Sequence, residues 1–236
     1  MTADSASINL THHFLIAMPG LEDAAFAKSV VYVCEHSERG ALGLVINKPS
    51  DLSMQSLFEK VDLSLHREDL MNAPVLQGGP VHTERGFVLH DAMVIPRSQD
   101  AAITVAETGP RLNAAEQEAK DEAQALSEVS EGSDASDNES VYASTMTIPG
   151  GLEMTTSKDV LEALSIGAGP KRVLISLGYS AWGEGQLESE LAENSWLTVG
   201  ADTAVIFDTP IEQRYERAMK LLGLEPWMLS NDVGHS

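Results

Sequence analysis

The sequence predicts one domain of the α+β class, and three observations support this prediction. Short apolar runs of strand length recur along the chain, as at residues 29–36 and 171–178, with turn residues such as Gly40 and Gly178 at or soon after their ends. Segments with apolar residues at helical spacing and capping residues at their starts stand between these runs. The chain has 236 residues, of which 43% are hydrophobic, which is enough to bury a core. We therefore expect one domain with an insertion.

The first part of the chain is predicted to consist mainly of strands. Residues 1–9 are small and polar, and we expect this N-terminus to be flexible. The expected strands span residues 10–18, 29–36, 41–47, 74–80 and 86–90. The last two follow each other closely, which favours a hairpin or a tight sheet corner. Residues 21–28 read as a turn or one or two helical turns, and a helix is expected from the N-cap candidate Ser53 to about Val61.

An acidic segment interrupts this pattern at about residues 97–140. It is rich in Ala, Glu, Ser and Asp and cannot bury enough apolar surface to offset the cost of ordering. Ten acidic residues against Arg111 and Lys120 give residues 106–140 a net charge of −8, so the remainder still carries −13. We expect a disordered or partly helical insertion, a solvated loop peculiar to this chain.

Strands and helices alternate after the insertion. The expected strands include Met146 to Ile148, residues 171–178 and residues 203–207. Helices are expected from a capping box at Thr156 to Asp159, and from Gln186 to about Asn194. The last helix has the strongest local signal, with Thr209 as N-cap, Pro210 at the first helical position and Gly223 just past its end.

Composition excludes several classes of protein. A formal net charge of −21 opposes direct binding to nucleic acid, which depends on clustered Lys and Arg. No apolar run reaches the roughly 20 residues that span a bilayer, so no membrane association is expected. The single cysteine rules out an internal disulfide framework, and we expect no disulfide-linked partner. The first residues do not resemble a secretion signal, so we expect no secretion. These features favour a cytoplasmic protein, and no motif calls for a metal or another cofactor.

Residues 29–36 carry the first candidate for chemistry. Side chains alternate along a strand, so Cys34 and His36 are expected on one face, next but one to each other. A neutral imidazole beside a thiol can promote the reactive thiolate. A lone cysteine in a valine-rich strand is, however, commonly a small buried hydrophobe. Both interpretations stay open at this stage.

Three turns carry the candidates for ligand binding. Ser180 resembles a nucleophile elbow on one side only, because Trp182 stands where the second glycine is required, and a serine hydrolase is rejected. The turn at Gly178-Tyr179-Ser180 could seat an anion at the start of a helix, although tight strand-to-helix packing explains its glycine equally well. The ligand-binding candidates are Asn47, Lys48, Gly78, Gly79, Tyr179 and Ser180.

Many separate motifs occur in an order that resembles the AlgH/YqgE family of bacterial proteins. They include Cys34-Glu35-His36, Gly43 to Pro49, Gly78-Gly79-Pro80, and Leu177-Gly-Tyr-Ser with the following Trp182 and Gly-Gln-Leu-Glu188. The resemblance covers the chain from residue 10 onward except the acidic segment, which the family usually crosses with a shorter connection. It implies a strongly bent, branched mixed β-sheet with partial barrel closure, surrounded by helices. It implies no agreed activity, although members are often labelled transcriptional regulators.

Three functions follow as hypotheses. The first is a non-enzymatic regulatory or adaptor protein that binds another protein or a small ligand. The second is a thiol-dependent enzyme or redox sensor centred on Cys34, with His36 beside it. The third, a transcriptional regulator acting on DNA, is disfavoured by the charge.

Overall fold

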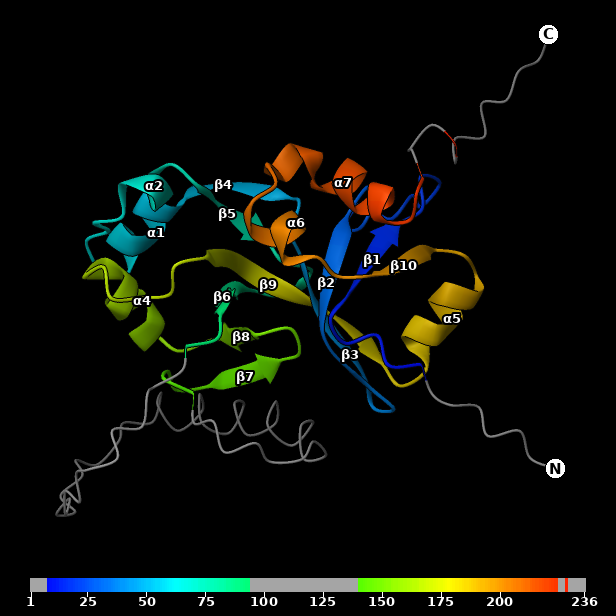
Figure 1. The fold of residues 1–236 in the computed structure, drawn as a ribbon, viewed down its shortest axis with the longest axis horizontal. Coiled ribbons are helices and arrows are strands. Elements are labelled where there is room, and N and C mark those ends of the chain that lie inside the picture. Colours follow the sequence, from blue (N-terminus) through cyan, green and yellow to red (C-terminus); the bar gives the residue numbers. More distant parts are fainter. Residues whose placement is uncertain (1–7, 94–139, 225–227, 229–236) are drawn as a thin grey trace, which may run out of the picture.

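The computed structural model describes residues 8–93, 140–224 and 228, and within them ten strands form one strongly curled sheet (Figure 1). The strand order is β10-β1-β2-β3-β9-β6-β8-β7, with β4 and β5 forming a side branch. The strands are β1 (His13–Ala17), β2 (Val30–Ser37), β3 (Gly40–Val45), β4 (Pro49–Ser53), β5 (Pro74–Gln77), β6 (Val81–Asp91), β7 (Thr145–Ile148), β8 (Leu152–Thr155), β9 (Val173–Gly183) and β10 (Trp196–Gly200).

The sheet branches at β9. The second half of β9 pairs antiparallel with β3, from Ser180 to Gly183. Its first half pairs in parallel with β5 at Ser176 and Leu177, and antiparallel with β6 along its other edge. One long strand therefore has two different neighbours on one side, which makes the sheet both branched and mixed, as the resemblance implied.

Helices cover the sheet on several sides (Figure 1). They are α1 (Met54–Lys60), α2 (Glu68–Met71), α4 (Asp159–Ser165), α5 (Gln186–Ala192), α6 (Thr203–Phe207), the 3-10 turn η1 (Ile211–Gln213) and α7 (Arg214–Leu221). The α1, α2 and α4 helices lie at one end of the molecule and α5 lies at the other, while α6 and α7 lie between them.

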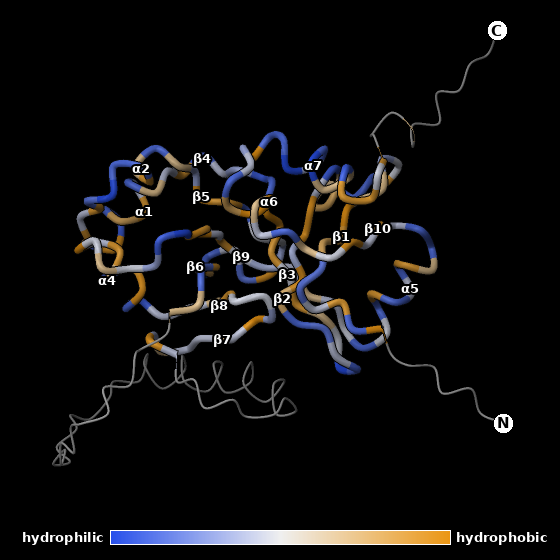
Figure 2. Tube along the Cα trace, in the orientation of Figure 1, coloured by the Kyte–Doolittle hydropathy of each residue, from blue (hydrophilic) through white to orange (hydrophobic). Residues whose placement is uncertain are grey.

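Side-chain alternation along the strands divides the interior into separate cores. The inner face of the curled sheet, with Phe14, Tyr32 and Phe87, packs against α6 and α7. The outer face of β1 to β3 packs with α5 around Trp182 and Trp196. The outer face of β5, β6 and β9 packs against α1, α2 and α4 in a third cluster. Figure 2 shows the corresponding apolar stretches along the chain.

Two of the predicted elements were wrong near the C-terminal end. Residues 203–207 form helix α6 rather than a strand, because the Asp202 side chain accepts a hydrogen bond from Ala204 N at 2.9 Å and caps a helix. Thr209 does not cap the following helix; its Oγ1 donates back to Ala204 O at 3.0 Å. The segment after Thr209 starts with the 3-10 turn η1, and helix α7 begins at Arg214. The predicted end at Gly223 agrees with its φ of 72°.

Other differences arise where strands pair across long distances. Residues 74–80 and 86–90 form no hairpin, because β5 and β6 flank β9 from opposite edges. The expected turn at residues 178–180 lies inside β9, which continues to Gly183. The predicted capping box at Thr156 is absent, since Lys158 is the N-cap of α4 and makes no side-chain cap. Strands β4, β8 and β10 were not predicted.

The acidic segment predicted at 97–140 lies outside the described residues except for Ser140. So does the predicted flexible start, apart from residues 8 and 9. Within the described residues, none of the helices has both the length and the apolar character needed to cross a membrane.

Candidate functional site

A cleft of about 330 Å³ opens between two groups of helices. Met54 of α1 and residues 67–74, which include α2, form one wall, and Ile206, Phe207, Ile211 and Arg214 form the other. Leu76 of β5 and residues 171–175, at the start of β9, form the floor. The cavity volume falls at the lower end of the range of about 300–1,000 Å³ that is common for small-molecule sites. The cleft is therefore large enough for a small organic ligand.

The charge of the cleft is opposite to that of the chain. Its lining holds four basic side chains and a single acidic one, Asp69; the basic residues are Arg67, Lys171, Arg172 and Arg214. The whole chain has 36 acidic residues against 15 basic ones. A local excess of positive charge in an acidic protein attracts anions to this place on the surface.

Two of the four cations are held by carboxylates of the chain. Arg67 forms a two-bond pair with Asp69, with Nη2 to Oδ2 at 2.6 Å and Nε to Oδ1 at 2.9 Å. Arg172 pairs with Asp91 in the same manner, with Nη2 to Oδ1 at 2.6 Å and Nε to Oδ2 at 3.0 Å. These bonds raise the pKa of both guanidinium groups. Arg67 and Arg172 therefore line the cleft with guanidinium groups that are already paired with carboxylates.

Arg214 differs from the other cations because it is buried, with 7% of its surface exposed. Its Nε donates to Thr209 O and its Nη1 donates to Ile46 O, which ties α7 to the end of β3. No carboxylate of the described residues lies within ion-pair distance of it. Burial lowers its pKa to about 10, and the negative charge of Glu212 offsets only part of this effect. A lowering of this size corresponds to roughly 3 kcal/mol against the charged form. A buried cation without a direct ion pair is a site where a bound anion would be stabilising.

One nitrogen of Arg214 is left for a ligand. Within the described part of the chain, Nη2 has no hydrogen-bond partner. The fully enclosed side-chain atoms without a partner there are the hydroxyls of Ser29 and Ser176, so Nη2 is not fully enclosed. The structure thus presents one buried, charged donor at the wall of a partly apolar cleft.

The six ligand-binding candidates from the sequence come together where β3, β5 and β9 meet, and none of them lines this cleft. Asn47 accepts from Val30 N at 2.7 Å and donates to Lys28 O at 2.8 Å. Lys48 Nζ donates to Ala25 O at 2.6 Å. The chain's own backbone occupies the polar groups of both side chains, which indicates a structural role.

The other four candidates form a tight crossing. A Cβ on Gly78 would lie 2.1 Å from Gly178 O, and one on Gly79 would lie 2.3 Å from Tyr179 O. Ser180 is fully buried, and its Oγ donates to Gly78 O at 3.2 Å. Because residues 178–180 lie within β9, they form no helix start that could seat an anion. Close backbone packing explains both glycines.

The prediction that Cys34 and His36 share a face was wrong. Val33 pairs with Gly43 and Glu35 pairs with Leu42, so β2 contains one extra residue at this point. Such a bulge reverses the alternation of side chains beyond it. Cys34 lies in the inner core, whereas His36 lies on the outer face, where its Nε2 is 2.9 Å from Glu188 Oε1.

The surroundings of both residues oppose thiol chemistry. Burial raises the pKa of the Cys34 thiol well above its ordinary value, and its exposed fraction is 2%. His36 Nδ1 accepts from Leu10 N at 3.0 Å, which leaves Nε2 to donate to Glu188. The imidazole therefore connects the segment before β1 to α5 and cannot act as a base for Cys34.

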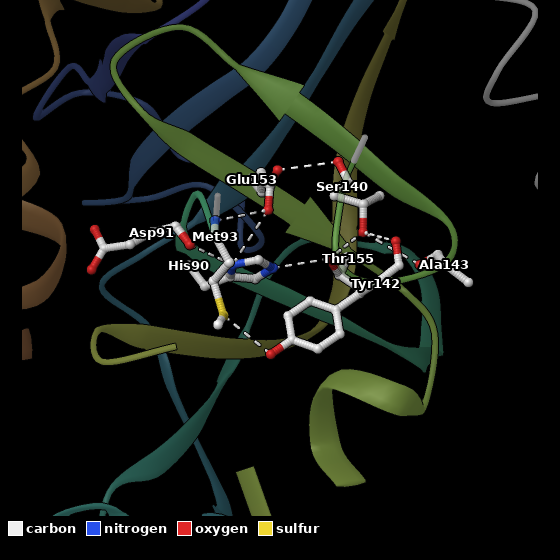
Figure 3. Close-up of polar contacts among 9 residues, drawn as sticks. His90, Asp91, Met93, Ser140, Tyr142, Ala143, Glu153 and Thr155 are labelled. Atoms are coloured by element: carbon white, nitrogen blue, oxygen red, sulfur yellow. Dashed lines mark hydrogen bonds and ion pairs between the residues drawn. The ribbon is translucent and has the colours of Figure 1, made fainter. Parts of the chain in front are cut away.

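A second polar cluster surrounds His90, which is fully buried in β6 (Figure 3). His90 Nε2 is 2.9 Å from Thr155 Oγ1, and its Nδ1 is 2.8 Å from Asp91 O. Glu153 accepts from Ser140 Oγ at 3.1 Å and from Met93 N at 3.5 Å. Glu153 thereby holds together the two described residues that flank residues 94–139.

Within the described residues, no group of three or more His, Cys, Asp or Glu side chains lies in an arrangement that could hold a metal ion. The cleft lining also contains no serine, cysteine or histidine in that part of the chain. Sequence reasoning did not single out any of the four basic residues of the cleft. Their only local signal is that Lys and Arg are scarce in this chain, and their clustering depends on contacts between distant segments.

Comparison with known proteins gives consistent results. A family model described as AlgH-like matches residues 14–135 and 119–227. UPF0301 proteins from Paracidovorax citrulli and Polaromonas sp. are 68% and 64% identical over 236 residues, which is all of both chains. These alignments include residues 97–140, so the expectation that the acidic segment is peculiar to this chain was wrong.

Solved structures show the same fold. The solution structure of the AlgH protein from Pseudomonas aeruginosa matches with a TM-score of 0.63 and 37% identity, and the match covers 98% of each chain. A crystal structure of a protein from Corynebacterium diphtheriae matches with a TM-score of 0.57 at 17% identity, over 89% of this chain and 86% of the other. The second match bears on the fold alone.

Proposed function

The chain belongs to the AlgH-like family, and from the geometry of its cleft we propose that it is a non-enzymatic regulatory or adaptor protein that binds a small anionic ligand. The observation that carries this proposal is the buried guanidinium of Arg214, which lines the cleft and forms no ion pair with a carboxylate among the described residues. Burial of an unpaired charge destabilises a fold. A bound anion would offset that cost, and the protein would be more stable with its ligand than without it.

Binding is favoured over catalysis by what surrounds Arg214. In the described residues, the lining offers no hydroxyl, thiol or imidazole for a nucleophile or a general base. Its one carboxylate, Asp69, is held by Arg67, and this bond keeps its pKa below the ordinary value. A ligand in this cleft would be held by charge and apolar contact without a group to transform it.

The two other hypotheses have less support. Cys34 lies in the packed core with a raised pKa, which opposes a thiol enzyme or an exposed redox sensor. Direct contact with DNA is opposed by the net charge of −21. A regulatory role would then be indirect, with occupancy of the cleft as the signal that a protein partner reads.

The test uses 8-anilinonaphthalene-1-sulfonate, an apolar anion whose fluorescence increases on binding. The full chain is titrated with this probe alongside two variants, Arg214→Gln and the matched control Arg217→Gln. Arg217 lies on the same helix but is exposed. We expect saturable binding by the wild type and by Arg217→Gln, and at least about tenfold weaker binding by Arg214→Gln. Equal binding by all three proteins would remove Arg214 as the anion site and contradict the proposal.

A further inference from the structure

The hydrogen-bond donors that remain available on the basic side chains of the cleft limit the chemical class of the ligand. Each of the guanidinium groups of Arg67 and Arg172 uses two nitrogens on a carboxylate. Arg67 Nη1 also donates to Pro170 O at 3.1 Å. Arg214 Nη2 and the ammonium of Lys171 are the cationic donors of the lining that have no ion pair within the described residues. Arg214 is buried and Lys171 is exposed, so the lining offers one buried cationic donor and one exposed donor to an anionic group.

Carboxylates beside the basic residues of the cleft disfavour ligands with several negative charges. Asp69 has a side chain that is 60% exposed. Asp91 and Asp208 both lie against Arg172, at 2.6 and 4.0 Å, and the side chain of Asp208 is 62% exposed. A di- or triphosphate that reached Arg214 would meet these negative charges without enough free cations to balance them.

The rest of the lining is apolar. Leu76 and Leu174 contribute to the floor, and Met54 and Ile206 contribute to the facing walls. Arg172 lies over the ring of Phe207 with its guanidinium carbon 4.9 Å from the ring centre, so this ring forms a firm part of the wall. Apolar walls around one charged donor are complementary to an apolar body with a single charged end.

We propose that the cleft binds a small organic monocarboxylate, with the carboxylate on Arg214 Nη2 and Lys171 and an apolar body against Leu76, Leu174 and Phe207. This inference rests on the proposed function and narrows it to one ligand class. A carboxylate oxygen can accept from Nη2 of Arg214, and its bond to a buried cation is stronger than a bond between neutral groups. The cavity of about 330 Å³ has room for an apolar body of about eight carbon atoms.

The probe is octanoate, measured by isothermal titration calorimetry on the full chain against two analogues. Octanamide keeps the shape without the charge, and octyl phosphate replaces the carboxylate by a group with more charge. We expect octanoate to bind at least about tenfold more tightly than either analogue. Arg214→Gln should lose this preference for octanoate over octanamide, and the exposed control Arg217→Gln should keep it.

A second variant covers the case in which Arg214→Gln fails to fold, since Arg214 also ties α7 to β3. Ala73 lines the cleft and is partly buried. Ala73→Phe fills the space without removing a charge, and we expect it to weaken octanoate binding at least about tenfold while the fold persists by circular dichroism. Unchanged octanoate binding by this variant would overturn the assignment of the cleft.

The outcomes separate this inference from the proposed function. Octanamide binding as tightly as octanoate, or octyl phosphate binding more tightly, would overturn the monocarboxylate class. Failure of octanoate to bind, with Arg214-dependent binding of the sulfonate probe retained, would overturn the class and leave the anion site standing. Failure of both probes would overturn both proposals.

Discussion

Replacing Gly79 by alanine tests whether the glycine pair at residues 78–79 serves packing or ligand binding. An added Cβ would lie 2.3 Å from the carbonyl carbon and oxygen of Tyr179 and 2.5 Å from Ser180 N. These are backbone atoms of β9, which is fixed between its neighbouring strands and cannot move aside. The φ of Gly79 is +154°, which an alanine adopts only with strain.

The expected cost follows from these two effects. Overpacking of a well-filled site costs about 1–3 kcal/mol, and an unfavourable backbone conformation adds about 1–2 kcal/mol. Gly79→Ala should therefore lower the free energy of unfolding by about 2–5 kcal/mol. For a chain of this size, each kcal/mol corresponds to a decrease in Tm of about 2–4 °C.

The matched control is Gly86→Ala in β6, where an added Cβ meets nothing within 4 Å and φ is not positive. This variant should stay within about 1 kcal/mol of the wild type. Guanidinium chloride unfolding, followed by circular dichroism, measures both variants. If Gly79→Ala were as stable as Gly86→Ala, the packing explanation would be refuted. If this stable Gly79→Ala variant also lost ligand binding, Gly78 and Gly79 would again be candidates for ligand binding.

Three further predictions follow from the buried polar groups. Native Cys34 should react with iodoacetamide at least about 100-fold more slowly than a free thiol at pH 7, because burial raises the pKa of its thiol and blocks access. A rate equal to that of a free thiol would contradict the burial of Cys34. Glu190→Ala should destabilise the fold by about 2–4 kcal/mol in chemical unfolding, because Glu190 Oε2 accepts from the indoles of Trp182 and Trp196 at 2.9 and 2.8 Å. The control is Glu193→Ala, which should be neutral because Glu193 is exposed. Glu35 has a pKa raised by burial, so the fold disfavours its charged form at neutral pH. Glu35→Gln should therefore stabilise the protein at pH 7, with the gain disappearing as pH falls below the ordinary value of 4.5, and a gain that persists at low pH would refute this cause.

The sequence predicted elements well where the signal is local. The strands around residues 29–36 and 41–47 and the helix after Ser53 occur close to the expected places, and Ser53 Oγ accepts from Ser56 N as a cap should. Prediction failed at residues 203–207, where β-branched and aromatic residues favour a strand by propensity. The Asp202 cap and the burial of Val205 and Ile206 against the sheet select a helix there instead.

The candidate site was harder to predict than the fold. The supposed Cys34 and His36 pair depends on regular alternation, and one extra residue in β2 places the two side chains on opposite faces. Nothing in β2 alone marks the bulge, because it is defined by the pairing with β3. The basic cleft was missed for a related reason, since Arg67, Arg172 and Arg214 are far apart in the sequence and meet only in the folded chain.

The sequence by itself determined the acidic charge of this protein, its mixture of strands and helices, and the ordered motifs that resemble its family. These properties depend on composition and on short-range spacing, which are readable without a fold. Only the tertiary structure decided that β9 branches the sheet and that the glycine segments at 78–79 and 178–180 pack against each other. It also decided that Arg214 is buried beside a cleft, with no ion pair to a carboxylate of the described residues. The physical reason is that burial, pairing register and the local excess of charge are set by contacts between residues distant in the chain.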